Sequence, residues 1–173
     1  MKKNKFFFPL FFLFLFFNNI SYSNSDIGFL DVEKVIYNSN TGKKFFTNLD
    51  KEIKKKNSQY KDIESKFKNE ENEILKKRNI ISKEEFNKNI NDLKEKISNH
   101  NKSKREFNQK ITEKRLIATN KLLKSLNQIV STYASEKSIS LILQKKNIIV
   151  GKAELDITNE ILEIFNDKVK SVK

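Results

Sequence analysis

Residues 46–74 read FTNLDKEIKKKNSQYKDIESKFKNEENEI. Mostly apolar side chains recur in this stretch at alternating steps of three and four residues. Eight such steps cover 28 residues, which is a mean period of 3.5. The positions are Phe46, Leu49, Ile53, Lys56, Tyr60, Ile63, Phe67, Glu70 and Ile74. Because a period of 3.5 is typical of a coiled-coil seam, the stretch predicts a long helix that packs along a second one.

The second helix is expected to begin just after this seam breaks, near residues 78–81. Ser82-Lys83-Glu84-Glu85 matches a capping box, in which the Ser82 and Glu85 side chains each bond the other residue's backbone N–H. The following seam positions are Phe86, Ile90, Leu93, Ile97, His100, Lys104, Phe107, Ile111, Lys114, Ala118, Leu122, Leu126, Ile129 and Tyr133. We therefore predict a long antiparallel α-helical hairpin, a coiled-coil arm over residues 41–137 with its tip near residues 78–83. At 1.5 Å per residue it extends on the order of 50 Å or more.

Several polar side chains occupy positions that a tight coiled coil would keep apolar. They are Lys56, Glu70, His100, Lys104 and Lys114. An arm with such a seam should be flexible. His100 is expected to be a partly exposed seam residue, since the sequence shows no partners for a ligand or a general base. Glu70, Glu71 and Glu73 are interpreted as a solvated face and not as an acid/base pair or a cation site.

The segments on either side of the arm, residues 24–40 and 138–173, have a different pattern. Residues 27–30 predict a strand, after which Asp31 can cap a short helix. Residues 139–144 and 148–150 predict two further strands, separated by a turn at residues 145–147. Asp156-Ile157-Thr158 opens a last helix, whose apolar face consists of Ile161, Leu162, Phe165, Val169 and Val172.

These two segments are small for an independent hydrophobic core. Their nearly all-apolar strands need cover on both faces and a partner at their edges, which association between copies would provide. We therefore predict the α+β class, with a small β body that forms oligomers and carries the helical arm. The residues assigned to the associating body are Ile27, Phe29, Leu30, Ile139, Leu141, Leu143, Ile148 and Val150.

Charge is distributed unevenly along the chain. The full sequence has a formal net charge of +13, and residues 41–137 hold 25 Lys and Arg against 14 Asp and Glu, a net of +11. One interpretation is compositional drift, because Lys, Asn, Ile and Phe are all abundant. Drift does not explain why the flanking segments are nearly neutral, which favours a functional positive charge on the arm.

Residues 1–23 are predicted to be a secretory signal peptide. A basic start, MKKNK, is followed by an apolar run of Phe and Leu over residues 6–17 and by a mostly polar stretch with small residues near Ser23. As a helix that run spans about 18 Å, which is short of the roughly 30 Å hydrocarbon core, so a permanent anchor is the weaker interpretation.

The composition argues against catalysis. The chain has no Cys, one His and three Gly. These counts leave no material for a thiol nucleophile, a Cys- or His-rich metal site, a Walker A loop or a dinucleotide fingerprint. The sequence therefore predicts no enzyme activity and no cofactor or metal.

The order of these segments resembles that of the Skp/OmpH periplasmic chaperones over the whole mature chain. The resemblance rests on IGFLDVEKVIYNSNTG (27–42), the long basic hairpin, and LILQKKNIIVGKAELDITNEIL (141–162). It implies a homotrimer with a β body from which three helical arms project around a cavity. It further implies that unfolded outer-membrane β-barrel proteins are held in that cavity without ATP. It also makes an anionic lipid or lipopolysaccharide surface a further candidate partner.

The residues suggest how such binding would work. Basic arms attract acidic clients over a Debye length of about 8 Å, and imperfectly paired seam residues offer sequence-tolerant apolar contacts. The client-binding residues we assign are Phe67, Lys76, Lys77, Arg78, Lys83 and Phe86. The alternative function is a structural coiled-coil protein that links envelope layers, which predicts tight seams and no segregated charge. Nucleic acid would fit the charge, but a secreted chain would not meet it in the cell, so no physiological nucleic-acid partner is expected.

Overall fold

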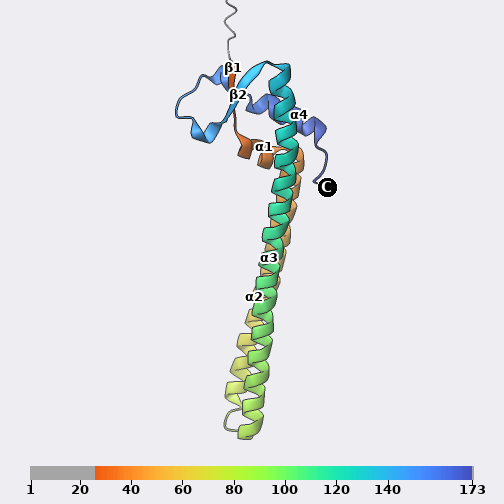
Figure 1. Cartoon of the computed structure of the whole chain (residues 1–173). Helices are drawn as coiled ribbons and strands as arrows, with labels where there is room; N and C mark the ends of the chain where they lie inside the picture. Colours follow the sequence, from red (N-terminus) through yellow and green to blue (C-terminus); the bar gives the residue numbers. More distant parts are fainter. Residues whose placement is uncertain (1–25, 173) are drawn as a thin grey trace, which may run out of the picture.

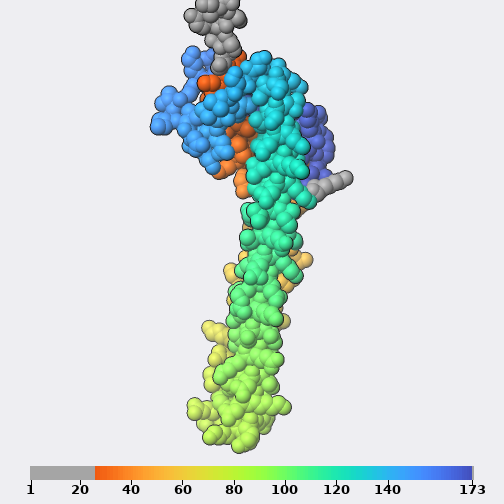
Figure 2. Space-filling view, in the orientation of Figure 1, coloured from red at the N-terminus to blue at the C-terminus, as the bar shows by residue number. Residues whose placement is uncertain are grey.

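The computed structural model describes residues 26–172. The predicted signal peptide at residues 1–23 lies outside the described residues. A small body carries one long arm (Figure 1). Figure 2 shows the same outline as a surface, with a slender arm below a wider body. No helix of the described part of the chain is both long enough and apolar enough to cross a membrane.

The arm consists of helices α2, Asn40–Lys76, and α3, Lys83–Glu136. They run side by side in opposite directions, since the partners of successive α2 acids move backwards along α3 (Figure 1). The Glu–Lys pairs that cross between the helices are Glu52–Lys114, Glu64–Lys104 and Glu70–Lys96, and Asp50 pairs with Arg115 beside the first of them. At 1.5 Å per residue, the 37 residues of α2 extend about 55 Å.

Both helix starts that were expected from capping residues are confirmed. The Ser82 hydroxyl accepts a hydrogen bond from the Glu85 backbone N–H at 3.1 Å, and α3 begins at Lys83, directly after Ser82. The Asp31 carboxylate accepts from the Lys34 backbone N–H at 2.9 Å at the start of α1, Val32–Asn38. These side chains satisfy backbone donors that have no partner within the first turn of a helix.

The body contains one sheet of two parallel strands, β1, Asp26–Leu30, and β2, Ile139–Gln144. Parallel neighbours need a long crossover connection. Here the connection is α1 together with the whole arm, which leaves the body and returns to it beside its starting point. In register, Ile27 faces Leu141 and Leu30 faces Gln144.

The predicted strand at residues 148–150 is wrong. After β2 the chain forms two 3-10 turns, η1 at Lys145–Asn147 and η2 at Ala153–Leu155, and residues 148–150 lie between them outside any strand. A strand requires neighbours for its backbone N–H and C=O groups. Within one copy β2 already pairs with β1, while Phe29 of β1 bridges to Asp156 on its other side. Both edges of β1 are therefore taken within the described chain, and residues 148–150 do not return along the free outer edge of β2.

The core of the body is built by all four α-helices. Helix α4, Thr158–Lys168, buries Ile161 and Phe165 completely. It packs against α1 and against the body end of α3, so the base of the arm belongs to the same core. The other buried side chains of this core are Leu30, Val35, Ile36, Phe46, Leu122, Leu126, Ile129, Tyr133 and Ile157.

Polar groups fix the start of α4 to the sheet. Asp156 receives hydrogen bonds from the Thr158 backbone N–H at 3.0 Å and from Lys145 Nζ at 2.6 Å. Burial acts to raise the pKa of Asp156, but the bonds from Lys145 and Thr158 outweigh it and hold that pKa below its ordinary value. The Thr158 hydroxyl also accepts from the Asp31 backbone N–H, which ties α4 to the end of β1.

Candidate functional site

The seam of the arm follows the predicted period. All but two of the expected seam positions are buried or half-buried, and the exceptions are Ile97 and Lys114. The positions from Leu122 to Tyr133 belong to the core of the body. The buried members nearest the middle and tip are Tyr60, Ile74, Leu93, His100 and Ile111. Between them lie half-buried positions, so the two helices are joined by spaced contacts and not by a continuous dry core.

Ion pairs fill the polar gaps in the seam. In each pair that crosses the arm, an acid of α2 contacts a base of α3, with Glu70 to Lys96 at 2.6 Å and Glu52 to Lys114 at 2.8 Å. All of these side chains are substantially exposed, so each pair contributes little to stability and mainly favours one register. Pairing also leaves many lysines of the arm without an acidic partner, which keeps its surface strongly positive.

His100 is buried, which corrects the expectation of a partly exposed position. Its imidazole lies between the rings of Tyr60 and Phe67, with centroid distances of 5.1 and 5.5 Å, and both ring pairs are perpendicular. Its Nε2 is 3.3 Å from Glu64 Oε1. Glu64 could not be predicted from the sequence as the partner of His100, because it lies one residue beyond the seam position Ile63 and belongs to the other helix.

The tip of the arm brings four predicted client-binding cations close together. Lys76 ends α2 and pairs with Glu73 at 2.7 Å, while Lys77, Arg78 and Lys83 lie exposed in and just after the turn. The hydrogen bond from Lys76 lowers the pKa of Glu73. The turn is short, so charges that are spread over eight residues of sequence share one end of the arm.

Two exposed apolar residues at this tip were missed by the sequence analysis. Ile80 is 80% exposed and Leu75 is 49% exposed, and both lie among the tip cations. Neither residue belongs to the seam repeat. Apolar residues outside the repeat are expected to be exposed, so this feature of the sequence could have identified both. The tip therefore presents apolar surface and positive charge together.

The two predicted aromatic client contacts, Phe67 and Phe86, lie at different distances from the tip. Phe86 is half-buried in the first turn of α3, beside the tip. Phe67 is half-buried nine residues before the end of α2, about 14 Å along the helix axis, where it packs on His100. The structure thus groups Phe86 with the cations and assigns Phe67 to the seam.

The predicted association residues of the body divide into two sets. Phe29 and Leu30 are buried within their own chain, and Ile139 and Ile148 are half-buried. The exposed apolar members are Ile27, Leu141, Leu143 and Val150, to which the structure adds Ile149. An apolar surface of this kind on a small body is typical of an interface.

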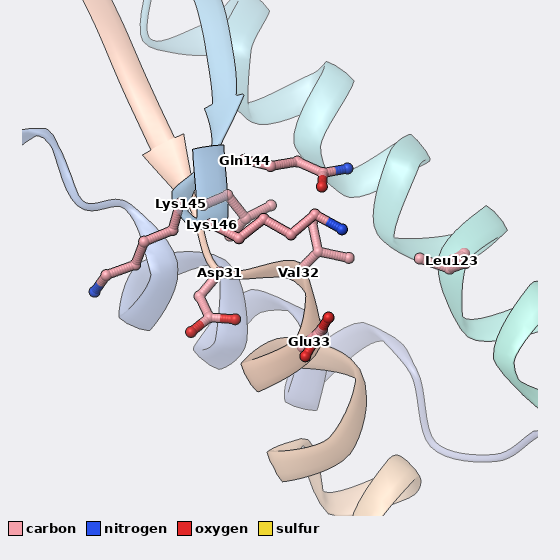
Figure 3. Close-up of a pocket in the computed structure, with 8 residues that line it drawn as sticks. Asp31, Val32, Glu33, Leu123, Gln144, Lys145 and Lys146 are labelled. Atoms are coloured by element: carbon pink, nitrogen blue, oxygen red, sulfur yellow. The ribbon is translucent and has the colours of Figure 1, made fainter. Parts of the chain in front are cut away.

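An open hollow of about 460 Å³ lies where the end of β2 approaches α3 (Figure 3). Leu30, Val32 and Leu123 supply apolar surface, and charged residues surround it. In Figure 3 the side chains of Lys145 and Lys146 extend in opposite directions. The lining holds no histidine and no hydroxyl nucleophile. Nowhere in residues 26–172 do three His, Cys, Asp or Glu side chains gather as a metal site would require.

Comparisons with known proteins agree with this architecture. Residues 26–165 match the family model of "Outer membrane protein (OmpH-like)". None of the curated proteins matches the sequence significantly. A solved structure from Caulobacter crescentus CB15, described as a candidate outer membrane chaperone (OmpH-like), superimposes with a TM-score of 0.76 at 14% identity. The match covers 85% of this chain and 87% of that one.

At that identity the structural match shows a shared fold, and the family match covers most of the chain. The fold it shares is the one described above, a small body with a long helical arm. We conclude that this chain belongs to the OmpH-like family.

Proposed function

We propose that the protein is a periplasmic holdase chaperone, which binds unfolded outer-membrane proteins without ATP and prevents their aggregation. Membership of the OmpH-like family supports a chaperone role, and so does the likeness to a candidate outer membrane chaperone. That family is not generally enzymatic. The observation that carries the proposal is the arm, which combines a net charge of +11 with an incompletely closed apolar seam.

The arm offers many weak contacts and no deep binding pocket. Unfolded β-barrel proteins expose alternating apolar strands that aggregate. Exposed apolar side chains such as Ile80 and Leu116 can contact such strands without a sequence requirement. The lysines attract acidic segments of a client over about 8 Å at physiological salt. Preferential binding of an unfolded chain is a simple linkage effect, so release on folding requires no nucleotide.

The test is capture of a urea-denatured porin on dilution, followed by light scattering and by the rate of complex formation. We expect the wild-type protein to keep the porin soluble. We expect the variant with Lys76→Gln, Lys77→Gln, Arg78→Gln and Lys83→Gln to associate roughly three- to tenfold more slowly at low salt. Its rate should also depend less on salt, because the charges that steer the client have been removed.

A matched control replaces four exposed lysines of α2 at the body end of the arm by Gln, namely Lys43, Lys44, Lys51 and Lys54. It changes the net charge equally, so a larger effect at the tip would assign capture to the tip. Equal rates and salt slopes for the tip variant and the wild type would remove the charge from the mechanism. A wild-type protein that leaves the porin aggregating would favour a structural spacer.

We further propose that the body assembles as a homotrimer. The support is the exposed apolar set Ile27, Leu141, Leu143, Ile149 and Val150, together with the outer edge of β2, which no strand covers within residues 26–172. An uncovered edge strand next to apolar side chains is a template for pairing with another chain. The unpaired residues 148–150 fit the same role, since they would find their strand partner on a neighbouring copy.

Assembly is tested by sedimentation at micromolar concentration. We expect a trimer for the mature wild-type chain, with a melting temperature that rises with protein concentration. The double change Leu141→Gln with Leu143→Gln should dissociate it. The pair Leu116→Gln with Ile117→Gln removes two similarly exposed apolar side chains from the arm and should leave the trimer intact. A stable folded wild-type monomer would contradict the proposal.

A further inference from the structure

The middle of the arm contains the one histidine of the chain in an enclosed position. The side chain of His100 is 6% exposed. Tyr60 and Phe67, both from α2, flank its ring, and the Tyr60 hydroxyl donates to the Ser103 carbonyl at 3.2 Å. Because these contacts restrict the ring, its Nε2 edge is held toward Glu64.

Glu64 serves two donors of the facing helix with the same oxygen. Its Oε1 accepts from Lys104 Nζ at 2.8 Å and lies 3.3 Å from His100 Nε2. The hydrogen bond from Lys104, followed by that from His100, lowers the pKa of Glu64. The carboxylate therefore stays ionised in mildly acidic solution, where histidine ordinarily becomes charged.

Charged groups from both helices lie near the imidazole. A hollow of about 300 Å³ beside the ring is lined by Glu64, Lys68 and Glu71 of α2. On α3 the neighbours one turn away are Lys96 and Lys104. Lys96 is bonded to Glu70, and Lys104 is bonded to Glu64. Glu64 is the carboxylate in hydrogen-bond reach of His100, so a charge on the ring has one direct partner.

We propose that His100 and Glu64 form a pH-dependent clasp between α3 and α2. In its neutral form the imidazole makes a long hydrogen bond across the seam, and Lys104 is the main cation on Glu64. In its charged form the ring becomes a second cation on the same carboxylate. A charge-assisted hydrogen bond then joins the two helices.

The clasp would change the stiffness of the arm and leave its fold unaltered. It lies about halfway between the body and the tip, with half-buried positions on both sides. Mid-arm separation of the helices should therefore be rarer at acidic pH. The clasp concerns the arm itself and does not depend on the proposed holdase activity.

Amide hydrogen exchange of the full mature protein at pH 5.5 and 7.5, corrected for intrinsic exchange rates, tests the clasp. We expect protection of residues 60–67 and 97–104 to rise about two- to fivefold at the lower pH. His100→Gln and Glu64→Gln should each abolish this rise. The imidazole proton resonances report charging without ambiguity, because the chain has a single histidine.

Glu70→Gln is the matched control, since it removes a carboxylate that bonds Lys96 but does not reach His100. It should retain the pH response, and the body strands should show none in any variant. An equal response in His100→Gln and in the wild type would overturn the clasp. So would a fall in protection at pH 5.5, or imidazole resonances that do not move between the two pH values.

Discussion

Replacement of Gly42 by alanine is expected to lower the free energy of unfolding by about 3 kcal/mol or more. A Cβ at this position would lie 1.8 Å from the Ile36 carbonyl oxygen and 2.9 Å from Ser39 Oγ. The first of these is a backbone atom of α1, so it cannot rotate away. Relief requires α1 to move, and α1 carries the buried side chains Val35 and Ile36. Urea unfolding at a fixed protein concentration measures the loss.

The requirement for glycine here comes from close approach and not from an unusual backbone angle. In the described residues no glycine has a positive φ. Gly28→Ala is therefore an informative control, since its Cβ would meet Ile157 Cγ2 at 3.5 Å, an ordinary contact. It should cost less than about 1 kcal/mol. A Gly42→Ala protein as stable as the wild type would show that α1 and α2 can separate at no cost.

Truncation of Phe165 to alanine should destabilise the body by about 3–5 kcal/mol. The ring is completely buried at the centre of the core, among side chains from α1, α3 and α4. Its loss would also loosen α4, whose C-terminal end is held by the bond from Thr41 Oγ1 to the Val169 carbonyl at 2.5 Å. Urea unfolding gives the total effect, and hydrogen exchange should locate the fastest new opening in α4.

Phe107→Ala provides the comparison within the arm. Phe107 is half-buried in the seam, 6.1 Å from the Tyr60 ring. Its truncation should cost about 1–2 kcal/mol and increase exchange locally, because it removes less buried apolar area. If Phe165→Ala and Phe107→Ala cost the same, the body would not contain the dominant core of the chain.

The core keeps the buried tyrosine at the body end of α3 in its neutral, hydrogen-bonded form. Tyr133 donates to Glu160 at 2.5 Å, across from α3 to α4. Burial, followed by the hydrogen bond and charge of Glu160, raises the pKa of Tyr133 to about 12. The neutral phenol is therefore the form that fits between these helices, and the bond adds a polar link to the apolar docking of α4.

Much of this molecule could be predicted from local pattern. The 3.5 period predicted the seam from Phe46 to Tyr133, because a repeat of that length places one side of each helix against its neighbour. Ser82 and Asp31 marked helix starts, since a cap acts on backbone groups only two or three residues away. The position of the arm tip followed from the break between the two repeats.

Contacts between distant segments could not be predicted in this way. His100 is buried beside Glu64 because α2 and α3 pack in one register. The periodicity of a single helix does not show which residue of the other helix will face a given position. Gly42 must be small because α1 ends against it. Residues 148–150 have a strand-like pattern but form no strand, since pairing depends on where the chain runs after η1 and not on the local pattern. Local periodicity therefore determined which helices form, whereas the tertiary structure alone decided which side chains each of them meets.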